Sequence, residues 1–408
     1  MNDEIVIIGG GHSGAQLCAG LAEAGLGNRV TLVCGEDLLP YHRPPLSKAF
    51  HKSPDETAQL HRAEAWYAEA GVTVLRGDPA ISIDRDRRIV TLRSGSLLPY
   101  GRLVLATGSR ARLLAELPER LANVATLRTA ADAHALRENL AGIQSLTVVG
   151  GGFIGLEFAA TARSLGKAVT VVEYAPRLLA RAVSPDISGH VLAMHRDAGI
   201  DVHLDARIAG FELEDTGAGR RLASIELGGR RHPIDFLLLG IGALPETSLA
   251  ESAGLACDNG IVVDEYMVTS DPAILAVGDC TSFPDHASGR RLRLESVQNA
   301  NDQARTAVAT LTGSPRPHHA IAWFWSEQGA MRLQMAGLLP ADPQSHRRPG
   351  AKPDSFSVFH YDCSALRCVE SVNAPMDHMM ARKLLEAGVD PDPAKVCDPK
   401  VPLKSFLA

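Results

Sequence analysis

A glycine-rich turn between a short apolar strand and a helix occurs twice in the chain, and no other feature restricts the fold as strongly. In the first copy, an apolar strand at residues 5–8 runs into Gly9-x-Gly11-x-x-Gly14 and then into a helical pattern. The first glycine allows the tight turn, the second lets a pyrophosphate approach the backbone, and the third lets helix and strand pack closely. Glu36, about 20 residues further on, can accept hydrogen bonds from ribose hydroxyls. This arrangement predicts a parallel α/β sheet that binds a dinucleotide at a helix N-terminus.

The same pattern recurs in the middle of the chain. The second copy consists of an apolar strand at 146–149, the glycines Gly150, Gly152 and Gly155, and a further strand that ends at Glu173. A glutamate at this strand end suits the free 2′-hydroxyl of NADH and repels the 2′-phosphate of NADPH, although the neighbouring Arg177 tempers that preference. We therefore expect two bound dinucleotides, with NADH preferred at the second site.

Length, charge and cysteine usage exclude several classes of protein. The chain has 408 residues, too many for one ordinary core, so two or three domains are expected. A formal charge of −6 argues against a nucleic-acid partner, whose binding depends on neutralising phosphates. The chain opens MNDEIVIIGGG without a basic n-region, and no apolar run is long enough to span a membrane. Seven scattered cysteines fit reduced thiols, so we expect a soluble, cytoplasmic protein without a membrane partner.

Further motifs, combined with the two glycine patterns, resemble a known family. These motifs are RPPLSK, LVLATGS, TLRT, GGGFIGLE, GIGALP, TSDPAILAVGDC, LESVQNANDQA, WFWSEQ and VNAP. The chain resembles the FAD-dependent, NADH-linked ferredoxin reductases of cytochrome P450 and Rieske-type oxygenase systems (putidaredoxin-reductase-like), and the likeness covers nearly its whole length. The resemblance implies an α/β fold with two Rossmann-like dinucleotide-binding domains, glutathione-reductase-like, plus a C-terminal α+β domain. The expected FAD-binding domain comprises 1–110 and 241–318, the NAD-binding domain 111–240, and the C-terminal domain 319–408.

The resemblance also implies which residues bind the cofactors. For FAD they are Gly9, Gly11, Ser13, Gly14, Glu36, Lys48, Ala80, Thr107, Gly108, Arg128, Asp279, Val297 and Trp325. For NADH they are Gly150, Gly152, Gly155 and Glu173, and Ile154 and Gly242 are further expected cofactor contacts. Lys48 and Glu157 are the expected catalytic residues, as an ion pair beside the flavin in which Glu157 reaches toward the nicotinamide; a plain structural salt bridge is the alternative.

Two features of the glycine loops and their surroundings do not follow the family pattern. His12 stands in the first glycine loop, where relatives often have an apolar residue. It either contacts a flavin phosphate or faces solvent as a turn histidine. Glu246 stands where many relatives have asparagine, and we have no functional interpretation of this change. No metal site is expected.

The segment YHRPPLSKAF, residues 41–50, contains no cysteine, whereas disulfide reductases carry a redox-active pair in this region. Electrons are therefore expected to leave one at a time, to a [2Fe–2S] ferredoxin. Such ferredoxins are typically acidic, which makes a basic docking patch an expectation. The candidate residues for this patch are Arg290, Arg291, Arg293, Arg347 and Arg348, although basic runs are more often just solvated surface.

Three alternatives remain open at this point. Cys363 and Cys368 have the spacing of a redox pair, but FHYDCSALRCVES is typical of two strands joined by a turn, so two hairpin cysteines are the favoured interpretation. An NADH oxidase or a rubredoxin reductase would share this fold. A redox-responsive NADH-binding protein, similar to apoptosis-inducing factor, is a third possibility from a different functional class.

Overall fold

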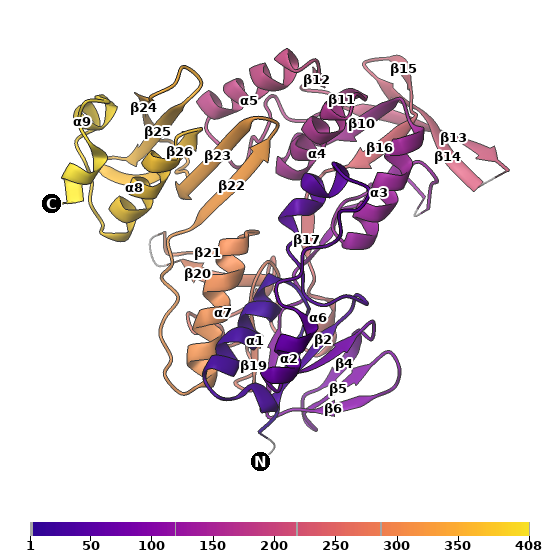
Figure 1. Cartoon of the computed structure of the whole chain (residues 1–408), viewed down its shortest axis with the longest axis vertical. Coiled ribbons are helices and arrows are strands. Elements are labelled where there is room, and N and C mark those ends of the chain that lie inside the picture. Colours follow the sequence, from indigo (N-terminus) through magenta and orange to yellow (C-terminus); the bar gives the residue numbers. More distant parts are fainter. Residues whose placement is uncertain (1–2, 119, 218, 286–287, 408) are drawn as a thin grey trace. The chain divides into compact units, whose positions relative to one another are not determined.

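The computed structural model describes residues 3–118, 120–217, 219–285 and 288–407. The chain forms two compact units, each assembled from three separate segments. The first unit comprises Met1–His42, Ala58–Arg110 and Ala243–Ala320, and the second comprises Arg43–Thr57, Ala111–Gly242 and Ile321–Ala408. Figure 1 shows the elements coloured along the sequence.

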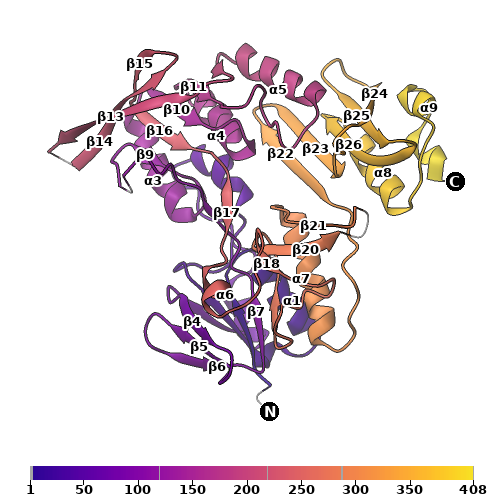
Figure 2. The ribbon, with the colours of Figure 1, turned by 180° about the vertical axis from the view of Figure 1, so that it is seen from behind.

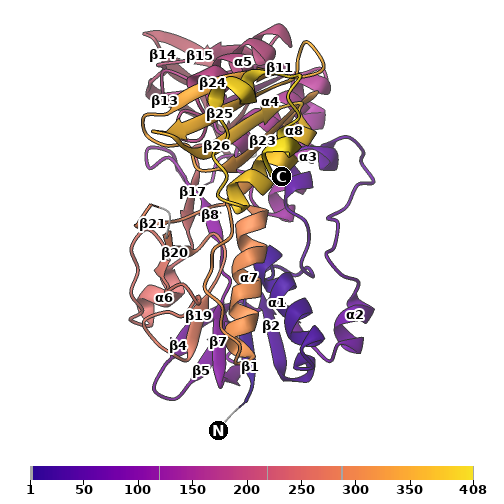
Figure 3. The same cartoon turned by 90° about the vertical axis from the view of Figure 1, so that its left-hand side faces the viewer.

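A parallel sheet of five strands forms the centre of the first unit, in the order β19-β7-β1-β2-β3. Its strands are β1 (Ile5–Ile8), β2 (Val30–Cys34), β3 (Thr73–Arg76), β7 (Arg102–Leu105) and β19 (Ile274–Ala276). All four residues of β1 are buried, as expected for a parallel strand covered on both faces. Helices α1 (His12–Glu23) and α7 (Val297–Leu311) pack side by side, which Figures 1 and 3 both show.

Smaller elements complete the first unit. They are an antiparallel sheet of β4 (Ala80–Asp84), β5 (Ile89–Leu92) and β6 (Leu97–Pro99), the strands β18 (Ile261–Val262), β20 (Thr281–Asp285) and β21 (Arg290–Leu292), the helices α2 (Glu64–Glu69) and α6 (Ser248–Ser252), and a 3₁₀ turn at Gly27–Arg29. The strands β8 (Ser109–Ala111) and β17 (Ala243–Pro245) lie where the sequence leaves and re-enters this unit.

The second unit contains another parallel sheet of five strands, in the order β12-β11-β10-β16-β9. Its strands are β9 (Val124–Ala125), β10 (Ser145–Val149), β11 (Ala168–Val172), β12 (Asp201–His203) and β16 (Phe236–Leu239). The accompanying helices are α3 (Ala130–Gly142), α4 (Phe153–Ser164) and α5 (Pro185–Asp197). The remaining strands β13 (Ile208–Thr216), β14 (Gly219–Leu227) and β15 (Arg230–Pro233) form an antiparallel sheet, visible in Figure 2.

The last part of the second unit is an antiparallel sheet with helices. The strands are β22 (Trp323–Gln328), β23 (Met331–Gly337), β24 (Gln344–Pro349), β25 (Phe356–Asp362) and β26 (Ala365–Val372), in the order β22-β23-β26-β25-β24. They are followed by α8 (Pro375–Glu386), α9 (Pro393–Cys397) and a 3₁₀ turn at Leu403–Leu407. This unit has two further 3₁₀ turns: Pro44–Ser47 lies within the PPLSK segment, and Ala49–His51 directly follows it.

The expected fold class is confirmed, because the chain has two parallel Rossmann-like sheets and an α+β C-terminal part. The division into three domains stays a prediction. None of the helices in the described part of the chain combines the length and the apolar character needed to cross a membrane.

Candidate functional site

The first glycine loop has the shape that a dinucleotide requires. Gly9 has a φ of +123°, and a Cβ at this position would lie 2.1 Å from the carbonyl oxygen of Ala106. A Cβ on Gly14 would lie 2.1 Å from the carbonyl oxygen of Gly9, so these two glycines are required for the strands and helix to approach. Beside Gly11, in contrast, a Cβ would meet no protein atom within 4 Å. The loop therefore leaves space open at the position where a pyrophosphate must approach the backbone.

The second glycine loop repeats this geometry. Gly150 has a φ of +105° and an added Cβ would lie 2.4 Å from the carbonyl oxygen of Gly240. A Cβ on Gly155 would lie 2.6 Å from the carbonyl oxygen of Gly150, whereas one on Gly152 would meet only the Gly240 oxygen, at 3.8 Å. Both loops thus fit a dinucleotide, and each precedes a helix whose first N–H groups face the open space.

The acidic residues that follow the two loops have different partners. The Tyr41 hydroxyl donates a hydrogen bond of 2.7 Å to Oε2 of Glu36. Glu173 instead accepts from backbone: the Gly151 N–H donates to its Oε2 at 2.5 Å and the Ala175 N–H to its Oε1 at 2.7 Å. Each carboxylate oxygen has a second lone pair, so Glu173 can still accept ribose hydroxyls.

Arg177, which the sequence placed as a possible 2′-phosphate partner, is bound elsewhere. Its guanidinium donates to the carbonyl oxygens of Val183 and Ala180, both at 2.7 Å. These two bonds direct the charge into the backbone of the same loop. The preference for NADH that Glu173 predicts is therefore not opposed by a guanidinium held ready for a phosphate.

Lys48 and Glu157 form the expected ion pair, with 2.6 Å between Nζ and Oε2. Glu157 is 3% exposed and lies on α4. Two hydroxyls complete its surroundings: Ser47 donates to Oε2 at 2.6 Å, and Ser326 donates to Oε1 at 2.8 Å. The carboxylate is thus held by three donors from the PPLSK segment and β22, all within the second unit.

The two serines beside Glu157 were not predicted from the sequence. Ser47 and Ser326 both lie in quoted motifs, PPLSK and WFWSEQ, but a serine in such a motif gives no sign of its partner. Hydrogen bonds from Thr161 Oγ1 to the Ser47 carbonyl oxygen, 2.9 Å, and from Gln328 Nε2 to Ser326 Oγ, 3.2 Å, hold the serines in turn. These two hydrogen bonds, together with those from Ser47 and Ser326 to the carboxylate, form one buried polar network around Glu157.

The expected FAD residues of the first unit lie around the end of its parallel sheet. Ser13 Oγ donates to the Ala300 carbonyl oxygen at 3.1 Å, at the junction of α1 and α7. Ser109 Oγ donates to Asp279 Oδ2 at 3.1 Å, and Thr107 Oγ1 donates to the Glu246 carbonyl oxygen at 2.6 Å. The other expected residues here are Gly108 with φ +71°, Ala80 at the start of β4 and Val297 at the start of α7.

The remaining expected residues belong to the second unit. Arg128 lies before α3, where its N–H donates to Asp132 Oδ2 at 2.9 Å and its carbonyl oxygen accepts from Arg43 at 2.7 Å. Trp325 lies on β22, with its ring centroid 5.6 Å from that of Trp323. Two others lie near the second glycine loop: Ile154, 46% exposed on α4, and Gly242, with φ +101°.

No disulfide links the cysteines, all of which lie in the described part of the chain. All seven are free, Cys363 is exposed in the turn between β25 and β26, and Cys368 is buried on β26. The hairpin interpretation is therefore confirmed. Burial raises the pKa of Cys368 well above its usual value, which keeps this thiol protonated and unreactive at neutral pH.

The five arginines expected to form a docking patch do not all reach the surface. Arg348 is 7% exposed and donates to the carbonyl oxygens of Val396 and Asp398, so its assignment to a surface patch was wrong. Its neighbour Arg347 is exposed and lies 3.8 Å from the centroid of the Phe356 ring. Arg290 and Arg291 are also exposed, although Arg291 donates to the Val263 carbonyl oxygen, and Arg293 pairs with Glu295.

Comparisons with known proteins agree with this geometry. Residues 3–304 match the family described as pyridine nucleotide-disulphide oxidoreductase, and residues 323–407 match the family described as reductase C-terminal. Rhodocoxin reductase of Rhodococcus erythropolis is 41% identical over 405 residues, which cover 99% of this chain and 94% of that protein. Putidaredoxin reductase CamA of Pseudomonas putida is 39% identical over 413 residues, covering 100% and 97%.

Solved structures give the same result. The ferredoxin reductase for the CYP199A2 system of Rhodopseudomonas palustris has a TM-score of 0.95 and 40% identity, covering all of both chains. The reductase in the covalent putidaredoxin reductase–putidaredoxin complex has a TM-score of 0.93 and 38% identity, covering 100% of this chain and 98% of that one. The chain belongs to the pyridine nucleotide-disulphide oxidoreductase family and, within it, to the FAD-dependent NADH:ferredoxin reductases of the putidaredoxin-reductase type.

Proposed function

We propose that this protein is an FAD-containing reductase that takes a hydride from NADH and passes single electrons to a [2Fe–2S] ferredoxin, which in turn serves a cytochrome P450 or a Rieske-type oxygenase. The observation that carries this proposal is the PPLSK segment. Where a disulfide reductase would hold cysteines, this chain places Ser47 and Lys48 on the buried Glu157 carboxylate. A reductase without thiols in this region needs an electron acceptor that requires only close approach.

The side chains would bind and orient rather than carry out the chemistry. FAD, when bound, accepts the hydride of NADH and releases the two electrons one at a time. We assign FAD to the glycine loop of Gly9 to Gly14 and NADH to that of Gly150 to Gly155, where Glu173 would accept the ribose hydroxyls. Lys48 would compensate the negative charge that reduction brings, and Glu157 would orient the carboxamide of NADH. Ser47 and Ser326 hold the Glu157 carboxylate in a single orientation.

Location and partner follow from the same assignment. We propose a cytoplasmic protein, since NADH is the electron donor and all seven cysteines are free thiols. The partner is identified by its chemistry, a small acidic protein with a [2Fe–2S] cluster. The relatives named for rhodocoxin and putidaredoxin support a partner of this class.

A stopped-flow experiment tests the proposal. The FAD-loaded protein is reduced anaerobically with NADH and mixed with several purified [2Fe–2S] ferredoxins, while the absorbance of each ferredoxin is followed. We expect at least one ferredoxin to be reduced in less than a second, with NADH preferred over NADPH. If no ferredoxin is reduced while oxygen is consumed rapidly, the protein is an NADH oxidase and the proposal is wrong. Slow transfer to every acceptor, with an NADH-dependent change in oligomeric state, would indicate a redox-responsive binding protein.

A further inference from the structure

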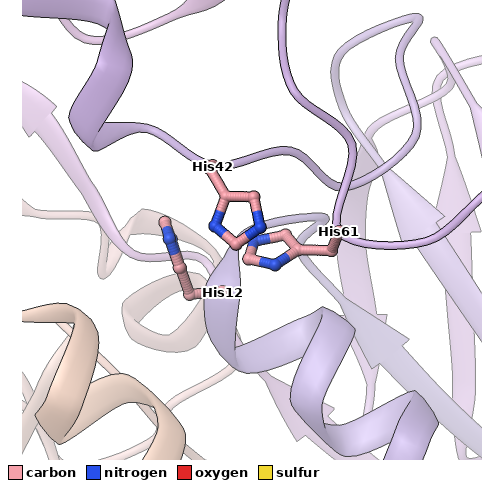
Figure 4. A group of neighbouring side chains, drawn as sticks. All are labelled: His12, His42 and His61. Carbon is pink, nitrogen blue, oxygen red and sulfur yellow. The ribbon is translucent and has the colours of Figure 1, made fainter.

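Three histidines from separate segments of the first unit lie together. His12 is the first residue of α1, His42 follows β2, and His61 precedes α2. A ring nitrogen of each lies within 4.8 Å of a ring nitrogen of the others. Figure 4 shows the imidazoles of His42 and His61 beside each other, with that of His12 next to them. We refer to these three residues as the histidine cluster.

The backbone holds two members of the histidine cluster on one face. Tyr41 and Leu60 form an antiparallel bridge, flanked by hydrogen bonds from the His42 N–H to the Gln59 carbonyl oxygen, 2.8 Å, and from the His61 N–H to the Pro40 carbonyl oxygen, 2.9 Å. In extended chains alternate residues point to the same side, so His42 and His61 share the face opposite to Tyr41 and Leu60. Their ring centroids are 3.9 Å apart.

The third member, His12, belongs to α1 rather than to the two bridged segments. His12 is only 9% exposed, and its ring centroid lies 4.6 Å from that of His61 and 5.7 Å from that of His42. It lies within the glycine loop, at the start of α1, the helix that follows β1. The largely buried imidazole of His12 thus meets the exposed imidazole of His42 and the half-buried imidazole of His61.

Three converging imidazoles are a ligand set for a borderline transition-metal ion. Imidazole suits Zn²⁺, Cu²⁺ and Ni²⁺, and three protein ligands with one open position are typical of zinc sites that exchange a fourth ligand. Two nitrogens bound to one tetrahedral Zn²⁺ are about 3.4 Å apart, so nitrogens within 4.8 Å need to move by about 1.4 Å at most. Rotation of the exposed His42 side chain supplies such a movement. Among the described residues no other such group of His, Cys, Asp and Glu side chains is found.

We propose that His12, His42 and His61 form a binding site for one divalent transition-metal ion of the zinc class, with the three imidazoles as ligands and a fourth position open. This site lies beside the first glycine loop, since His12 directly follows Gly11. Its three ligands belong to the first unit, whereas the Lys48–Glu157 network belongs to the second.

Zinc binding to the FAD-loaded, chelator-treated protein tests this site. Calorimetric titration with zinc sulfate in a non-coordinating buffer should give one tight equivalent per chain. His42→Gln is the primary variant because this exposed side chain is the least needed for folding, and it should weaken zinc binding about tenfold or more. His61→Gln and the double variant should weaken it further, with unchanged FAD content.

His203→Gln is the matched control, because His203 is a partly exposed histidine 2.8 Å from Asp201 Oδ2 in the other unit. It should bind zinc as the parent protein does. The proposal is overturned if the FAD-loaded protein binds no stoichiometric zinc, or if zinc binds only after FAD is removed, since the imidazoles would then serve the dinucleotide. Equal binding in His42→Gln and the parent, or loss of binding in His203→Gln, would overturn it as well.

Discussion

The two glycine loops have the same backbone and differ in what surrounds them. In both, the first glycine has a positive φ and the third packs onto the first, while the middle glycine faces open space. The first loop continues into His12, which joins the histidine cluster, and the second into Phe153, whose ring lies 4.6 Å from that of Phe324. The glycine motif therefore determines where a dinucleotide can bind, and the neighbouring elements determine which side chains surround it.

The acidic residues that follow the two loops also differ in their hydrogen-bond donors. Glu36 is held by a tyrosine side chain, whereas Glu173 is held by two backbone N–H groups of its own loops. The second unit also has a buried carboxylate, Glu157, supplied with three donors from the PPLSK segment and β22. The glycine loop is thus present in both units, whereas the charged network belongs to the second unit alone among the described residues.

The largest effect is expected from replacing the first glycine of each loop. Gly9→Ala places a Cβ 2.1 Å from a carbonyl oxygen at a φ of +123°, so the first unit should lose FAD and give colourless protein. Gly150→Ala should give yellow protein that NADH no longer reduces, because its clash at 2.4 Å lies in the second unit. The ratio of FAD to protein and the rate of anaerobic reduction measure both. Yellow Gly9→Ala and colourless Gly150→Ala would reverse our assignment of the two sites.

The charged network should respond next most strongly. Lys48→Met leaves the 3% exposed Glu157 carboxylate without its cation, and breaking a buried ion pair in this way costs about 3–5 kcal/mol. We expect the lower end, about 3 kcal/mol, because Ser47 and Ser326 still donate to the carboxylate. Urea denaturation measures the loss, with the exposed Lys52→Met as control. If Lys48→Met lowers the free energy of unfolding no more than Lys52→Met does, Lys48 does not stabilise the Glu157 carboxylate as we infer.

The middle glycines should separate cofactor binding from stability. A Cβ on Gly11 meets no protein atom within 4 Å, and one on Gly152 meets an oxygen only at 3.8 Å. Alanine at either position should therefore change the free energy of unfolding of the cofactor-free protein by less than about 1 kcal/mol. Gly11→Ala should release FAD faster, and Gly152→Ala should raise KM for NADH about tenfold, or 1.4 kcal/mol. Gly142→Ala, at the end of α3 with no atom within 4 Å, is the control for both.

The last prediction concerns the choice between NADH and NADPH. Glu173→Gln removes the charge that repels a 2′-phosphate, so the ratio of kcat/KM for NADPH to that for NADH should rise by about tenfold. Arg177→Gln should leave this ratio unchanged, because its guanidinium is bound to the carbonyl oxygens of Val183 and Ala180. A fall in the ratio for Arg177→Gln would show that this arginine does contact NADPH.

Much of the fold was predictable because its signals are local. The strand, glycines, helix and acid of each unit follow one another within about 30 residues, and the roles of these glycines depend on backbone sterics alone. The hairpin of Cys363 and Cys368 was predictable in the same way, from alternating apolar residues around a turn. The Lys48–Glu157 pair was expected only through the family resemblance, since 109 residues separate its members.

Other features depended on residues that the sequence places far apart. Ser326 lies 169 residues from Glu157, and no local pattern links a strand serine to a helix glutamate. Arg348 has the appearance of a surface charge in SHRRPG, yet the backbone carbonyl oxygens of residues 396–401 surround it. A cationic side chain is buried wherever tertiary packing supplies enough acceptors, and a sequence does not reveal that supply.

The histidine cluster shows most clearly which features follow from the sequence and which depend on the tertiary structure. The sequence by itself determined two dinucleotide cradles, because glycine spacing and the 3.6-residue and 2-residue periodicities act through the nearest neighbours in the chain. It predicted no metal site, since His12, His42 and His61 share no spacing that a metal-binding motif uses. Only the tertiary structure decided that they meet: the sheet positions α1, an antiparallel bridge aligns residues 42 and 61, and three imidazoles converge.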